Sequence, residues 1–137
     1  MGEKRTLKPE YEAIGLKLMK TEPALFDIAE SGARFAFLES DSPKKTHDKI
    51  ILGECEKVAS KNQWAIDADF LIILYTPNII GLDEKQIEIL IFHELLHAGV
   101  EYGEDGATYY IKNHDLEDFK IIIDRYGTEW NIPEEEK

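Results

Sequence analysis

Residues 82–99, LDEKQIEILIFHELLHAG, form the segment that most constrains the fold of this chain. Apolar side chains recur at helical spacing on one face and also cover most of the opposite face, which predicts a helix that is buried nearly all round. Asp83 followed by Gln86 resembles a capping box and places the start of this helix, and Gly99 is expected to end it. Three polar side chains, those of His93, Glu94 and His97, therefore fall inside a buried helix and need partners there.

The remaining pattern predicts an α+β fold in a single domain of 137 residues, with a small, mostly antiparallel sheet packed against the buried helix. Further helices are expected at 9–20, 23–30 and 115–127, and strands at 33–40, 49–59 and 69–75. The strand at 69–75 has an unbroken apolar run, which indicates burial on both faces. Residues 100–113 are typical of a β-hairpin with Asp105-Gly106 near its tip. Residues 41–48 are expected to form a loop, and residues 1–8 and 131–137 flexible tails.

The spacing His93-Glu94-x-x-His97 is that of the HExxH zinc motif. Positions i and i+4 share a helix face, so the two imidazoles can approach one zinc ion while Glu94 serves as the general base for a water molecule. The competing interpretation is a buried helix whose histidines are hydrogen-bonded in the core. A third ligand would favour the zinc site.

Two residues are candidates for that third ligand. The extended metzincin motif would require Gly at position 100 and His at position 103, where this chain has Val100 and Gly103. His114 follows the predicted hairpin, and the spacing of Glu117 from His97 resembles that of thermolysin-like enzymes. We favour His114 as the ligand, with Glu117 as the alternative.

Composition restricts the partners of the chain. Its net charge of −12 opposes binding to a nucleic-acid backbone, and no apolar run approaches the length of a membrane span. Cys55 is the only cysteine, which excludes an internal disulfide bond. The first ten residues lack the apolar core of a secretory signal, so we expect a cytoplasmic protein.

Taken together, residues 69–75, the motif His93–His97 and the downstream His114-Asp115 with Glu117 and Phe119 resemble the putative phage metallopeptidase family. The resemblance covers roughly the last two-thirds of the chain and implies a minimal zincin-like domain, distantly similar to SprT-type metallopeptidases. It also implies one zinc ion held by His93, His97 and His114, with Glu94 as the base. The expected function is peptide-bond hydrolysis on a protein or peptide substrate, in a bacterial host cytoplasm if the gene belongs to a phage or prophage.

Several assignments stay open at the level of sequence. Asp115 is a helix cap or an acceptor for a ligating imidazole, and Tyr110 on the hairpin is a possible donor to the oxyanion of the reaction. Residues 49–59 carry charges typical of a sheet edge, where a peptide substrate could add as a strand. The alternative to an enzyme is a non-catalytic zinc-stabilised factor of phage or prophage origin that binds a protein. A third possibility is an acidic interaction module without a metal.

Overall fold

Strand β6 (Phe70–Tyr75) is the buried inner strand of the main sheet in the computed structural model, which describes residues 2–47, 49–113 and 119–133. The sheet has the order β1–β2–β6–β5 among these residues, with β1 at Arg5–Leu7, β2 at Phe35–Ser40 and β5 at Gly53–Lys57. Strand β2 runs parallel to β6, and the pairs β1–β2 and β5–β6 are antiparallel. The predicted α+β class with a mostly antiparallel sheet is therefore confirmed.

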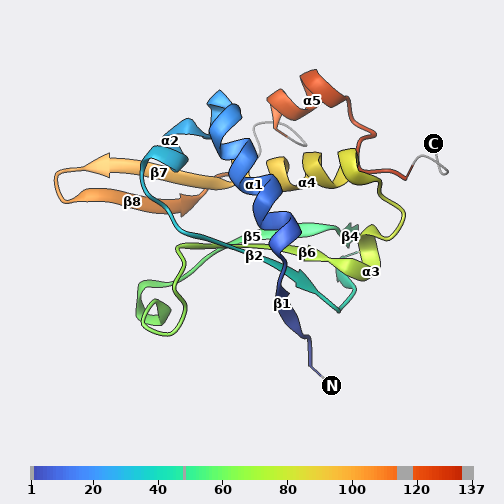
Figure 1. Cartoon of the computed structure of the whole chain (residues 1–137), viewed down its shortest axis with the longest axis horizontal. Helices are drawn as coiled ribbons and strands as arrows, with labels where there is room; N and C mark the ends of the chain where they lie inside the picture. Colours follow the sequence, from blue (N-terminus) through green and yellow to red (C-terminus); the bar gives the residue numbers. More distant parts are fainter. Residues whose placement is uncertain (1, 48, 114–118, 134–137) are drawn as a thin grey trace.

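Helices α1 (Pro9–Thr21) and α4 (Glu84–Leu96) cover one face of this sheet (Figure 1). Alternate side chains of β6, such as Phe70, Ile72 and Leu74, are fully buried in the same apolar core as Phe92 and Leu95 of α4. This two-layer arrangement explains why α4 is apolar on most of its surface, since the sheet lies on one side and α1 on another. The expected helices at 9–20 and 23–30 are present, the second as a 3-10 turn η1 (Pro23–Leu25) followed by α2 (Phe26–Glu30).

The start of α4 agrees with the sequence prediction, and its end does not. Asp83 accepts a hydrogen bond from the Gln86 amide at 2.9 Å, and the Gln86 side chain accepts one from the Asp83 amide at 3.0 Å. The helix ends at Leu96, with His97 as its cap, and Gly99 already belongs to strand β7 (Ala98–Gly103). Gly99 instead leaves room for the Tyr110 ring, because a Cβ atom there would lie 2.5 Å from that ring as it is placed.

The predicted hairpin is confirmed as β7 paired with β8 (Gly106–Ile111), and Figure 1 shows it projecting from the body of the molecule. Gly106 follows the turn with a φ of 106°, a conformation that favours glycine.

Residues 41–59 differ from the prediction. The expected loop contains strand β3 (Lys44–Thr46), and the expected single strand is two strands, β4 (Lys49–Ile51) and β5. Strands β3 and β4 form a second small hairpin, and the Asn78 amide donates to the carbonyl oxygens of Lys44 and Ile51 at its base. Asn78 lies on the short helix α3 (Thr76–Ile79), so a contact distant in sequence decides where the strand divides.

Described residues near both ends of the chain contact the rest of the fold. Strand β1 lies within residues 1–8, and Pro133, within residues 131–137, packs close to Gly81. The last helix, α5 (Lys120–Tyr126), begins later than residue 115, with Phe119 as its cap, and Gly127 ends it with a φ of 79°. A 3-10 turn, η2 (Ser60–Asn62), lies in the connection from β5 to β6.

Within the described ranges, no helix combines the length and apolar content that crossing a membrane requires.

Candidate metal centre

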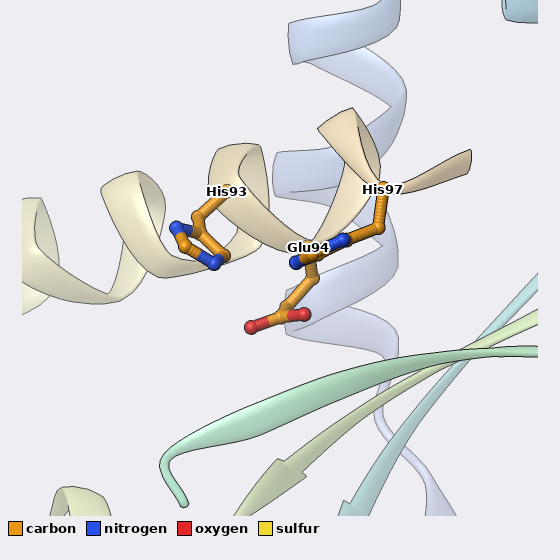
Figure 2. A group of neighbouring side chains, drawn as sticks. All are labelled: His93, Glu94 and His97. Atoms are coloured by element: carbon orange, nitrogen blue, oxygen red, sulfur yellow. The ribbon is translucent and has the colours of Figure 1, made fainter. Parts of the chain in front are cut away.

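The side chains of His93, Glu94 and His97 converge at the C-terminal end of α4. One possible ligand atom from each lies within 4.8 Å of the corresponding atoms of the other two. His97 caps the helix but keeps a helical backbone, with φ −72° and ψ −20°, so the i, i+4 relation to His93 is preserved. Figure 2 shows both imidazoles on the same side of the helix, with the Glu94 carboxylate between them and directed toward the sheet.

His97 is oriented by the backbone of Lys112, the residue that follows β8. The Lys112 amide donates to the His97 carbonyl at 2.6 Å, and the imidazole Nδ1 lies 2.7 Å from the Lys112 carbonyl oxygen. A carbonyl oxygen only accepts, so Nδ1 carries the proton and donates. The other ring nitrogen, Nε2, is then left as the one with a lone pair for a metal, which is the usual arrangement of a metal-binding histidine.

Aromatic rings enclose the two imidazoles. The Phe119 ring centroid lies 5.6 Å from that of His93 and 5.0 Å from that of His97, and the Trp130 ring lies 5.6 Å from His93. Both Phe119 and Trp130 are buried. These apolar walls lower the local dielectric and restrict the rotation of the imidazoles, which are conditions that strengthen binding of a cation to neutral nitrogen ligands.

Glu94 lies against strand β5 at Gly53. A Cβ atom built at Gly53 would stand 3.5 Å from both Cγ and Oε2 of Glu94 and 3.0 Å from the carbonyl oxygen of Ile73. The distances to Glu94 are ordinary van der Waals contacts, whereas the distance to Ile73 is tight, so a side chain at position 53 would crowd the backbone of strand β6. Glycine at this position lets the sheet approach the buried Glu94, which is only 4% exposed.

Gln86 connects the start of α4 to the segment that carries Trp130. Its Nε2 donates to the carbonyl oxygens of Trp130 at 2.9 Å and Ile132 at 2.5 Å, while its Oε1 serves the capping box. Sequence spacing predicts the cap but not this second role of Gln86, because the two carbonyl groups are more than forty residues away.

Replacing Gln86 by leucine should lower the free energy of unfolding by about 2–3 kcal/mol, since it leaves partly or fully buried backbone groups without their partners. Denaturant unfolding would measure the loss. Glu84→Gln, an exposed change on the same helix, should stay within about 0.5 kcal/mol. An equal effect of the two substitutions would show that the contacts of Gln86 do not stabilise the fold.

A cleft of about 470 Å³ opens beside the three side chains. Residues 50–55 form one wall, and α4 contributes Leu90, His93, Glu94 and His97. Its other described lining residues are Thr46, Ile111, Ile123, Thr128, Trp130 and Asn131. Its volume lies within the range of ligand-binding pockets, and its described lining contains histidines and carboxylates but no lysine or arginine.

Cys55 also lines this cleft, which raises the question of a cysteine nucleophile. Burial raises the pKa of the Cys55 thiol, and the negative charge of Glu94 adds to the effect. The thiol is therefore neutral near pH 7, whereas a nucleophilic cysteine needs the thiolate. The histidines and Glu94 are therefore better candidates for chemistry in this cleft than Cys55.

The other predicted site residues fall in different places. His114, Asp115 and Glu117 lie outside the described residues. Tyr110 lines a second, smaller hollow near α2 rather than the cleft of the histidines, so the structure does not bring it to the site. Three further residues at the site, Gly53, Lys112 and Trp130, were not predicted, because none of them belongs to a motif that sequence spacing reveals.

Fold and site together define a small α+β domain with a candidate metal centre on its buried helix, where imidazole nitrogens and a carboxylate fit a divalent cation. The chain belongs to the family described as putative phage metallopeptidases, whose model matches residues 4–133. The family implies a hydrolase with protein or peptide substrates. No curated protein and no solved structure matches the chain significantly.

Proposed function

We propose that this protein is a zinc-dependent peptidase that uses Glu94 as its general base. The observation that carries the proposal is the convergence of His93, Glu94 and His97 at an open cleft, within a chain of a metallopeptidase family. The orientation of His97 by Lys112 adds support, since a proton on Nδ1 leaves Nε2 as the nitrogen that could bind a metal.

We assign His93, His97 and His114 as ligands of one zinc ion, with Glu117 as the alternative third ligand. The residues that flank the stretch 113–118 both contact the site. Lys112 bonds to His97, and Phe119 packs against both imidazoles. Only six residues separate these two contacts, which supports a ligand from this stretch. Asp115 is then close enough in sequence to accept a hydrogen bond from a ligating imidazole.

The proposed reaction is the attack of water on a peptide carbonyl. A bound zinc ion would supply Lewis acidity and lower the pKa of water to about 7. Glu94 accepts the proton of the attacking water and returns it to the leaving amine, while its buried position beside Gly53 keeps the carboxylate in place. The walls formed by Phe119 and Trp130 exclude bulk water from the imidazoles.

Strand β5 is the proposed support for the substrate backbone. Among the described residues it is one of the two edge strands of the main sheet, and it runs beneath α4 (Figure 1). Its residues 53–55 line the cleft. An extended peptide can add to such an edge through backbone hydrogen bonds, which fix its position without requiring a particular sequence. The proposed setting is the cytoplasm of a bacterial host.

Zinc content and peptide cleavage test this function directly. The purified protein should contain one zinc ion per chain and cleave an unfolded protein such as reduced casein, and a chelator should abolish cleavage until zinc is restored. His114→Ala should weaken zinc binding at least about 100-fold, since it removes a ligand and even indirect partners of ligands contribute 10–100-fold. Glu117→Ala should change zinc binding little.

The opposite result for these two variants would assign the third ligand to Glu117. Zinc binding without any cleavage would identify the protein as a non-catalytic zinc-stabilised binding factor. Absence of zinc binding would refute both the zinc peptidase and the zinc-stabilised binding factor. The acidic interaction module without a metal would then be the interpretation that is left.

A further inference from the structure

Two large apolar side chains at the edge of the cleft are exposed to solvent. Ile50 on β4 is 58% exposed and Ile111 at the end of β8 is 40% exposed, and both line the cleft of the histidines. We call this pair the rim isoleucines. Strand β4 lies near one end of β5 and the end of β8 lies toward the other (Figure 1), so the two isoleucines come from strands at different ends of β5.

The rim isoleucines are held by structure rather than by a loose loop. Ile50 belongs to the β3–β4 hairpin that Asn78 fixes at its base, directly beside Ile51. Ile111 pairs with Ala98, the residue after His97, and precedes Lys112, which bonds to that histidine. Both isoleucines lie on strands that are already ordered. Binding of a ligand therefore requires no further ordering of the backbone at either residue.

The charges of the cleft restrict what can bind between the rim isoleucines. Among the described lining residues, the carboxylates are Glu54 and Glu94, and none is lysine or arginine. Tyr75 donates to Glu54 at 2.6 Å and Lys44 pairs with the same carboxylate, so Glu54 is held in place. Lys44 already balances the charge of Glu54, and the described lining holds no lysine or arginine to pair with an acidic side chain of a ligand.

We infer that the substrate is an extended polypeptide segment with apolar side chains on both sides of the bond to be cut, one against Ile50 and one against Ile111. Apolar side chains of a folded protein are mostly buried, so a segment of this kind is available in unfolded or flexible regions. This inference rests on the proposed function, because it names the substrate class of the same cleft.

Binding of two labelled peptides to the zinc-loaded Glu94→Gln protein tests the inference. Both are uncharged fluorescein-labelled decapeptides, one with leucine on each side of the central bond and the other with serine there. Fluorescence anisotropy should show the leucine peptide binding at least about tenfold tighter, as expected for burial of two apolar groups. Ile50→Ser and Ile111→Ser should each weaken binding of the leucine peptide about fivefold and leave the serine peptide unchanged.

Ile80→Ser is the matched control, because Ile80 is 80% exposed and does not line the cleft. It should not change the affinity for either peptide, and thermal unfolding should show all three variants folded. Equal affinity for the two peptides, or rim variants that bind as the parent does, would overturn the inference. So would a protein dimer that Ile50→Ser and Ile111→Ser dissociate without any change in peptide binding.

Turnover by the wild-type protein separates this inference from the proposed function. Selective binding of the leucine peptide without cleavage would support apolar recognition and refute the hydrolase. Cleavage of both peptides at equal kcat/KM would support the hydrolase and refute apolar recognition.

Discussion

A Glu94→Gln variant should bind zinc as tightly as the parent and hydrolyse peptides about 10²–10⁴-fold more slowly, the usual contribution of a general base. The amide has the shape of the carboxylate, so the approach of β5 at Gly53 is preserved. It cannot accept the proton of the attacking water. Steady-state cleavage of an unfolded protein, with zinc content measured on the same samples, would give both quantities.

Glu88→Gln provides the control for that experiment, because Glu88 is on the same helix and does not line the cleft. Its activity should equal that of the parent. Retention of more than a tenth of the activity in Glu94→Gln would exclude Glu94 as the base. Loss of zinc from that variant would instead make Glu94 a ligand, which its position within 4.8 Å of the imidazole nitrogens permits.

Removal of zinc should lower the thermal stability of the protein substantially. A ligand present at about 1,000 times its dissociation constant stabilises the native state by about 4 kcal/mol. For a chain of this length that corresponds to a shift in Tm of roughly 10–15 °C. Calorimetry of the zinc-loaded and chelator-treated protein would measure the shift, which should shrink at acid pH because protonated imidazoles do not bind metal.

His97→Ala tests whether that stabilisation arises at the proposed centre. The variant should show almost no difference in Tm between zinc-loaded and metal-free samples, whereas Glu94→Gln should keep the full difference. A persistent shift in His97→Ala would place the stabilising ion elsewhere in the chain, and the proposed ligand set would be wrong.

Local patterns in the sequence predicted α4 well. Apolar periodicity and the pair Asp83 and Gln86 were sufficient to place its first turn, since a capping box acts over three residues. The predicted end of α4 at Gly99 was wrong. Lys112, fifteen residues along the chain, forms hydrogen bonds with His97, and a strand begins directly after that residue. The division of residues 49–59 into two strands has the same origin, in the distant amide of Asn78.

For this chain, periodicity within single elements was sufficient to predict the α+β class and the buried helix, and spacing within that helix was sufficient to predict the trio His93, Glu94 and His97. Tertiary structure decided the remaining features of the site: the orientation of His97 by Lys112, the approach of Gly53 to Glu94 and the rings that enclose the imidazoles. These features join residues that are distant in the chain. Periodicity reports which side of an element is buried, and the packing of whole elements determines what it is buried against.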